Sequence, residues 1–161
     1  MSKGRESAVV LLIDDEPEYL AFVVDYLESL GLKTEIARNL PEAMAAIDRN
    51  VYRLILVDME IPALGADAVV KRPSAVAHKY PGIVAAIHCR NQGYGAHQVI
   101  AYTVHDDDAA DAELRKLNCR YVLKGRPEAL KRVIQSSLGS KPPSEAGKGG
   151  HRGTPKSRPR S

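Results

Sequence analysis

The sequence lacks several features on which particular protein classes depend. Tryptophan is absent, phenylalanine occurs once, and aromatic residues make up only 5% of the 161 residues. Cysteine occurs twice, at Cys89 and Cys119, and two cysteines cannot form the disulfide framework of a small secreted domain. The first apolar run, residues 8–13, is six residues long and ends in acids, so it is too short for an export signal or a membrane span. We therefore expect a reduced, cytoplasmic protein with an aliphatic core.

Apolar runs alternate with helical patterns along most of the chain, and 44% of the residues are hydrophobic, which is enough to form the core of one domain. The first run is apolar at every position, as in a strand that is covered on both faces. Five successive strand–helix units predict an α/β fold, in which a doubly wound parallel sheet carries helices on both faces. Strands are expected at residues 8–13, 32–37, 52–57, 99–103 and 120–124. Helices are expected at residues 17–30, 40–49, 107–117 and 127–138, with one kinked or two short helices between 67 and 90.

Local signals set the helix boundaries. Pro17 suits the first turn of a helix, and Asp15 is placed to cap it. Gly31 supplies the stop of the same helix. The acidic run 106–108 is typical of a helix N-terminus, where the helix dipole favours negative charge.

The last part of the chain differs in composition from the rest. The first 140 residues hold 17 Lys and Arg against 19 Asp and Glu, whereas residues 141–161 hold 6 against 1. That segment is rich in Pro, Gly and Ser and has no hydrophobic period, so we expect one domain over residues 1–140 and a disordered basic tail over residues 141–161. The tail lacks an amphipathic helix and interleaved aromatic residues, and we expect no specific nucleic-acid recognition.

Polar residues follow the apolar strands at the point where each strand ends. Asp14 and Asp15 follow the first strand, Asp58 the third, Thr103 ends the fourth and Lys124 the fifth. Because the carboxyl ends of parallel strands line one crevice of an open sheet, these side chains should converge. Carboxylates close together at low dielectric repel and must protonate, separate or bind a cation. Oxygen ligands from few protein groups suit Mg²⁺.

A magnesium ion beside a lysine and a hydroxyl donor would trap a phosphoryl group. The metal and Lys124 would neutralise charge on the phosphoryl oxygens, and Thr103 would donate a hydrogen bond to another oxygen. Asp58 can supply the nucleophile, since an aspartate can form an acyl phosphate. The residues at the strand ends therefore predict phosphoryl transfer onto a carboxylate.

Four motifs occur in an order and at strand ends that point to a known family. They are LLIDDEP, LILVDMEIP, VIAYT and YVLKG, and they lie between about Ala8 and Leu138. In these motifs the chain resembles the receiver domain of two-component response regulators, of the stand-alone, single-domain type. The resemblance implies a flavodoxin-like, five-stranded parallel sheet with strand order 2-1-3-4-5.

The resemblance also implies roles for the acids. Asp58 would accept a phosphoryl group from the phosphohistidine of a histidine kinase or of a histidine phosphotransfer protein. Asp15, Asp58 and the main-chain carbonyl of Glu60 would ligate Mg²⁺, with Asp14 acting through water. We accordingly expect no dedicated enzyme, but a protein that catalyses its own phosphoryl transfer and slow autodephosphorylation.

A two-state switch is implied as well. Thr103 and Lys124 would bind the phosphoryl oxygens, and Tyr121 falls at the family's switch aromatic, whose ring turns inward as the Thr hydroxyl shifts toward the phosphate. Phosphorylation would then change the surface of the fourth predicted helix, the fifth strand and the fifth helix, and another protein would read the change. The sequence leaves open which target this is and whether phosphorylation drives a homodimer.

The sequence departs from the family pattern at three places. The connection between the third and fourth strands is longer than the usual single helix, and Pro73 and Pro81 predict an added turn or helix. Gly125 replaces the proline usual after the lysine, so a cis peptide need not form there. Val104 stands where a small residue usually follows the Thr and is expected to crowd access to the phosphoryl group.

Two other functions fit the same residues. One is a Mg²⁺-dependent phosphatase or phosphotransferase with an Asp nucleophile, in which the second acid would be Glu60, two residues beyond Asp58. The other is a receiver-like adaptor that binds partners without phosphorylation. Multiple turnover on small phosphoesters would favour the first, and partner affinity that ignores a phosphoryl mimic would favour the second.

Overall fold

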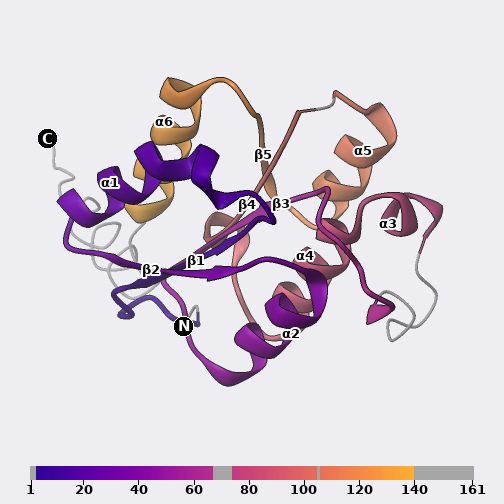
Figure 1. Cartoon of the computed structure of the whole chain (residues 1–161), viewed down its shortest axis with the longest axis horizontal. Coiled ribbons are helices and arrows are strands. Elements are labelled where there is room, and N and C mark those ends of the chain that lie inside the picture. Colours follow the sequence, from indigo (N-terminus) through magenta and orange to yellow (C-terminus); the bar gives the residue numbers. More distant parts are fainter. Residues whose placement is uncertain (1–2, 67–73, 105, 140–161) are drawn as a thin grey trace, which may run out of the picture.

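The computed structural model describes residues 3–66, 74–104 and 106–139. Its centre is one parallel sheet of five strands in the order β2-β1-β3-β4-β5, with helices around it (Figure 1). This confirms the predicted fold and strand order. The strands are β1 (Val9–Ile13), β2 (Lys33–Ala37), β3 (Leu54–Asp58), β4 (Val99–Thr103) and β5 (Arg120–Leu123).

The helices also follow the predicted pattern. A 3₁₀ turn, η1 (Pro17–Leu20), leads into the first α-helix, and a second, η3 (Ala96–Gln98), precedes β4. The α-helices are α1 (Ala21–Ser29), α2 (Leu40–Arg49), α3 (Ala75–Lys79), α4 (Pro81–Asn91), α5 (Asp108–Lys116) and α6 (Pro127–Leu138). Within the described residues, no helix is both long enough and apolar enough to cross a membrane.

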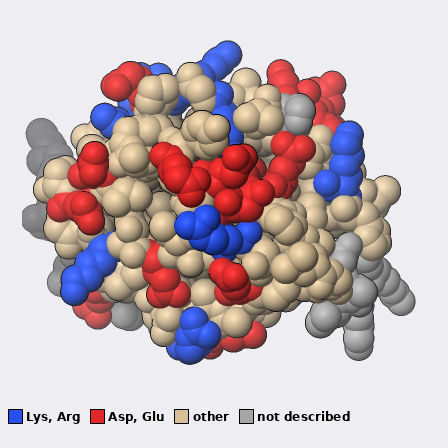
Figure 2. Space-filling model, in the orientation of Figure 1, with Lys and Arg blue, Asp and Glu red and all other residues tan. Residues whose placement is uncertain are grey.

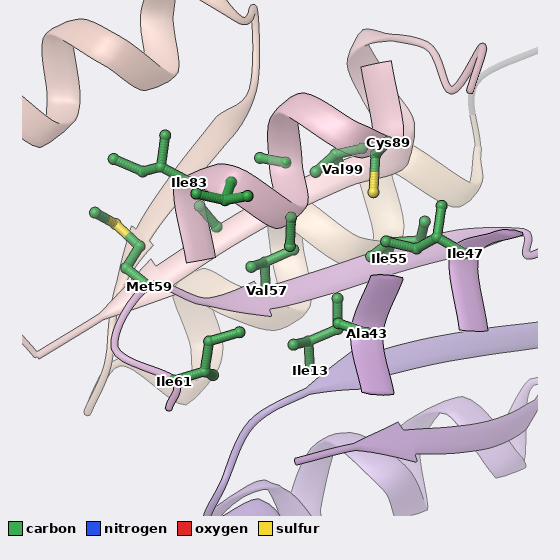
Figure 3. Close-up of a cluster of buried hydrophobic side chains, with 14 of the residues drawn as sticks. Ile13, Ala43, Ile47, Ile55, Val57, Met59, Ile61, Ile83, Cys89 and Val99 are labelled. Atoms are coloured by element: carbon green, nitrogen blue, oxygen red, sulfur yellow. The ribbon is translucent and has the colours of Figure 1, made fainter. Parts of the chain in front are cut away.

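Alternate residues along each strand build two separate cores, one on each face of the sheet. On one face, side chains such as Leu12 and Leu56 pack against Val23 of α1 and Ile134 of α6. On the other face, the strands pack against α2, α3, α4 and α5. Figure 3 shows part of this second cluster, in which side chains from β1, β3, α2 and α4 meet. Every residue of β3 and β4 is buried, as expected for central strands that are covered on both sides.

The prediction that Asp15 caps the first helix is wrong. The residue before η1 is Glu16, and no side chain caps this turn. Instead, Oδ1 of Asp14 accepts a hydrogen bond from the main-chain N–H of Glu16 at 2.8 Å. Asp14 is the fully buried member of the acidic pair, and its carboxylate lies against this turn. Gly31, with φ +82°, ends the helix as predicted.

Among the described residues, the long connection between β3 and β4 contains two α-helices, one of the two arrangements that the sequence predicted. α3 ends at Lys79 and α4 begins at Pro81, so the break falls at Tyr80. Pro73 and the rest of residues 67–73 lie outside the described residues, as does the predicted tail at 141–161. The predicted domain boundary therefore stays a prediction.

The start of α4 packs directly against the end of β3. The main-chain N–H of Gly82 donates to the carbonyl of Met59 at 2.9 Å. A Cβ atom at this position would lie 2.3 Å from the carbonyl oxygen of Asp58, closer than any real contact, so only glycine fits. The start of α4 is thus anchored at the strand end that carries Asp58.

Candidate functional site

Three carboxylates converge at the carboxyl edge of the sheet, as the strand ends predicted. Asp14 is fully buried, Asp58 is 4% exposed, and Asp15 is half-buried. An oxygen of each lies within 4.8 Å of an oxygen of the other two. The parallel pairing of β1 and β3 explains this, because Ile13 pairs with Val57, so Asp14 and Asp58 are the next residues along the two strands. Figure 2 shows Asp and Glu side chains gathered near the centre of one face, next to a group of Lys and Arg side chains.

Lys124, which follows β5, reaches into the same edge. Its Nζ lies 2.9 Å from Oδ2 of Asp58 and 3.4 Å from Oδ2 of Asp14. The main-chain N–H of Lys124 donates to the carbonyl of Thr103 at 2.6 Å. This hydrogen bond to the end of β4 fixes the position of the Lys124 backbone beside the site. The lysine side chain is 22% exposed, whereas the two carboxylates that it contacts are buried. One cation therefore serves two buried acids.

The local environment shifts the proton affinities of the two partners. Burial raises the pKa of Asp58, and the nearby charge of Asp14 raises it further. A hydrogen bond from the main-chain N–H of Glu60, 3.0 Å from Oδ1, and the contact with Lys124 oppose this rise in pKa. Burial alone would lower the pKa of Lys124, but the contacts with Asp58 and Asp14 leave it raised. The lysine consequently stays charged, and the excess negative charge of the site falls on the acids.

These donors fit a hard divalent cation. Three carboxylates within reach of one point are the oxygen ligands that Mg²⁺ uses, and one lysine cannot neutralise all of them. Glu60 lies two residues beyond β3 with an exposed side chain, and its N–H is bound to Asp58. The structure thus brings Asp14, Asp15, Asp58 and Lys124 together, while the individual roles of these residues stay predictions.

Thr103 and Tyr121, the predicted switch residues, lie on the two neighbouring strands β4 and β5. Thr103 ends β4 and is 1% exposed. Tyr121 is half-buried and packs against the core on the α2 to α5 side of the sheet. Burial raises the pKa of Tyr121, and a hydrogen bond with the backbone of Asp107, just before α5, opposes that rise. Tyr121 therefore contacts the loop that joins β4 to α5.

The sequence analysis missed one residue of the site, Tyr102. It is 1% exposed, and its hydroxyl donates a hydrogen bond to Oδ2 of Asp14 at 2.8 Å. Its ring centroid lies 5.0 Å from Nζ of Lys124. Burial, followed by the charge of Asp14, raises the pKa of Tyr102 well above its ordinary value, so the phenol keeps its proton. The available signal was a tyrosine in the otherwise apolar run VIAYT, one residue before Thr103.

A cavity of about 350 Å³ opens beside the site. It lies between η1, the start of α1 and the loop from β5 to α6, and Tyr102 and Lys124 form part of its wall. Tyr19 and Val104, which also line it, are 73% and 60% exposed. Gly125, another lining residue, has φ +85°, a conformation that proline cannot adopt, and the described residues contain no cis peptide bond.

No protein-family model and no curated protein matches the sequence. Solved structures do match. A CheY-like response-regulator receiver domain from Methanospirillum hungatei JF-1 is similar with a TM-score of 0.63 and 19% identity, over 88% of this chain and 97% of that chain. The BeF₃-activated N-terminal receiver domain of RstA from Klebsiella pneumoniae gives a TM-score of 0.63 and 19% identity, over 82% and 99% of the two chains.

A third similar structure holds a metal. It is the receiver domain of the sensor histidine kinase PA1611 from Pseudomonas aeruginosa PAO1, with a magnesium ion coordinated in its active-site cleft. Its TM-score is 0.59 and its identity 23%, over 82% of this chain and 98% of that chain. The chain therefore has the CheY-like fold of response-regulator receiver domains, as its motifs predicted.

Proposed function

We propose that this chain is a cytoplasmic, phosphorylation-dependent signalling switch of a two-component or phosphorelay system, with Asp58 as the phosphoacceptor and Mg²⁺ as its cofactor. One observation carries the proposal: Nζ of Lys124 lies 2.9 Å from a carboxylate that belongs to a nest of three buried or half-buried acids. A lysine and an acidic metal site on either side of a carboxylate are the parts that phosphoryl transfer needs. The magnesium ion in the similar domain of PA1611 and the BeF₃-activated state of RstA support the same function.

The chemistry follows from the positions of the side chains. An oxygen of the ionised Asp58 attacks the phosphorus of a phosphohistidine on a histidine kinase or phosphotransfer protein, and the phosphorus–nitrogen bond breaks. The bonding electron pair leaves with the imidazole nitrogen, which takes up a proton from solvent. Lys124 moves its contact from Asp58 to a phosphoryl oxygen, and the Thr103 hydroxyl donates to another. Asp15, Asp58 and the main-chain carbonyl of Glu60 would hold Mg²⁺, with Asp14 acting through water, and the ion would supply positive charge to offset that of the transferring group.

The switch would use elements that contact one another here. Movement of Thr103 toward the phosphoryl group shifts the start of the loop between β4 and α5, and Tyr121 contacts that loop at Asp107. The surface of α5, β5 and α6 would then change, and a protein partner would bind one state more tightly than the other. Phosphorylation biases an equilibrium between two arrangements of this surface.

Incubation with Mg²⁺ and a small acyl phosphate donor tests the proposal. Intact-protein mass spectrometry should show one added phosphoryl group on the wild type, and none on Asp58→Asn or in EDTA. Asp25→Asn is the matched control, because Asp25 is an exposed acid on α1 outside the nest, and this variant should label like the wild type. Labelling of Asp58→Asn would overturn the assignment. Multiple turnover on small phosphoesters would point instead to the phosphatase.

A further inference from the structure

Tyr102 places a polar group where the sheet is otherwise apolar. All five residues of β4 are buried, and the Tyr102 ring packs in the core between the sheet and helices α1 and α6. In the ladder between β3 and β4, Tyr102 stands directly opposite Asp58. Its hydroxyl nevertheless reaches past that neighbour to Asp14, two strands away in the order of the sheet. Phenylalanine would fill the same volume, so core packing does not require the hydroxyl.

The hydroxyl completes the hydrogen bonding of a fully buried carboxylate. Oδ1 of Asp14 accepts from the N–H of Glu16 at 2.8 Å. Oδ2 accepts from the Tyr102 hydroxyl at 2.8 Å and lies 3.4 Å from Nζ of Lys124. A buried carboxylate needs such donors, because water cannot solvate it. Of the two contacts to Oδ2, the one from Tyr102 is the shorter, and it comes from a ring that is almost fully buried.

We infer that Tyr102 is a positioning residue of the metal site, whose hydroxyl fixes the carboxylate of Asp14 in the orientation that the cation needs. The inference rests on the proposed function, because it concerns the Mg²⁺ that this function requires. Two donors, one on each oxygen, prevent the Asp14 carboxylate from rotating, so its orientation toward Asp15 and Asp58 is set before the cation arrives. The Tyr102 ring also makes a cation–π contact with Lys124, whose Nζ lies 5.0 Å from the ring centroid.

The chain contains a matched control for this hydroxyl. Tyr52 is also fully buried, and its hydroxyl also donates to a carboxylate at 2.8 Å, that of Glu35. Tyr52 precedes β3, at the end of the strand opposite to Asp58, and Glu35 belongs to the edge strand β2. Tyr102→Phe and Tyr52→Phe therefore remove the same group from the same kind of hydrogen bond, one inside the site and the other outside it.

The test measures the Mg²⁺ dissociation constant of the wild type and both variants by isothermal titration calorimetry. Tyr102→Phe should weaken Mg²⁺ binding by about 10- to 100-fold, the usual effect of losing a partner of a metal-binding group. Tyr52→Phe should leave it unchanged. Thermal unfolding in EDTA should show a loss of stability in both variants, because each loses a hydrogen bond to a carboxylate. A loss of stability alone therefore does not identify the residue that supports Mg²⁺ binding. Unchanged or tighter Mg²⁺ binding by Tyr102→Phe would overturn the inference.

A double variant separates positioning from a general disturbance of the site. In an Asp14→Asn background, Tyr102→Phe should no longer change the Mg²⁺ dissociation constant, because the group that the hydroxyl positions is gone. An undiminished effect in that background would show that Tyr102 acts elsewhere. Failure of the wild type to bind Mg²⁺ would instead remove the proposed function, and this inference with it. Mg²⁺ binding by the wild type that Tyr102→Phe fully retains would remove the inference alone.

Discussion

Replacing Lys124 by methionine tests whether one cation holds the acidic site together in the absence of metal. Nζ of Lys124 lies 2.9 Å from Asp58 and 3.4 Å from Asp14, which are 4% and 0% exposed. Removing one partner of a buried ion pair costs about 3–5 kcal/mol, because the other charge stays buried. The lysine side chain is 22% exposed, and solvent screening lowers the expected loss to about 2–3 kcal/mol of unfolding free energy.

Urea unfolding in EDTA measures this loss. The deficit of Lys124→Met should be small in acid and grow as the pH rises above about 4, the ordinary pKa of an aspartate. Burial raises the pKa of Asp58, and loss of the ammonium raises it further, so protonation relieves the repulsion in acid but not at higher pH. Saturating Mg²⁺ should restore much of the lost stability, because the cation binds only the folded site.

Lys131→Met serves as the control. Lys131 lies on α6 with its Nζ 5.6 Å from the centroid of the Tyr26 ring, and this variant should lose at most about 1 kcal/mol, with no dependence on Mg²⁺. If Lys124→Met were as stable as the wild type in EDTA at neutral pH, the lysine would not be needed to hold the carboxylates. The electrostatic account of the site would then be wrong.

Two further predictions concern the connection that contains α3 and α4. Gly82→Ala should lower the unfolding free energy by at least about 1–3 kcal/mol in urea melts, because its Cβ would lie 2.3 Å from the Asp58 carbonyl oxygen; wild-type stability would contradict the close approach. Tyr80→Phe removes the hydroxyl that donates to Asp107 at 2.6 Å, the largest cause that lowers the pKa of Asp107 to about 2. The stability difference from wild type should be full above about pH 4 and shrink as the pH falls toward 2, and a difference independent of pH would refute the coupling.

The sheet could be predicted from the sequence because its central strands are short, continuous apolar runs. Residues of β3 and β4 are apolar nearly throughout, and such short runs between helical patterns have few other uses. The convergence of Asp14, Asp58 and Lys124 followed from the topology alone, since parallel strands end at one edge. The division of the long connection into α3 and α4 was left between two arrangements, because Pro81 is compatible with either a kink or a new first turn.

Other features depend on three-dimensional positions that the sequence does not contain. Whether Asp14 or Asp15 forms the turn before η1 depends on which of two adjacent side chains points inward, and the prediction chose the wrong one. Tyr102 contacts Asp14 across 88 positions of sequence, and no local pattern distinguishes it from a tyrosine that only fills the core. The anchoring of Gly82 under Asp58 likewise appears only once the helices are placed.

The charges of the site indicate why the proposed function would need both a lysine and a metal. With Asp14, Asp15 and Asp58 ionised, Lys124 cancels one of three negative charges and leaves two, which a single divalent cation balances. The Tyr102 hydroxyl and the Glu16 and Glu60 N–H groups are uncharged donors. They bind carboxylate oxygens of Asp14 and Asp58 but add no net charge. Under the proposed function, a phosphoryl group transferred to Asp58 would bring new negative charge to the nest, and Lys124 would move its contact from the carboxylate to a phosphoryl oxygen. The rearrangement of the proposed switch would therefore begin with a change of charge at Asp58, which is buried, so that the change would act more strongly on neighbouring charges than it would in water.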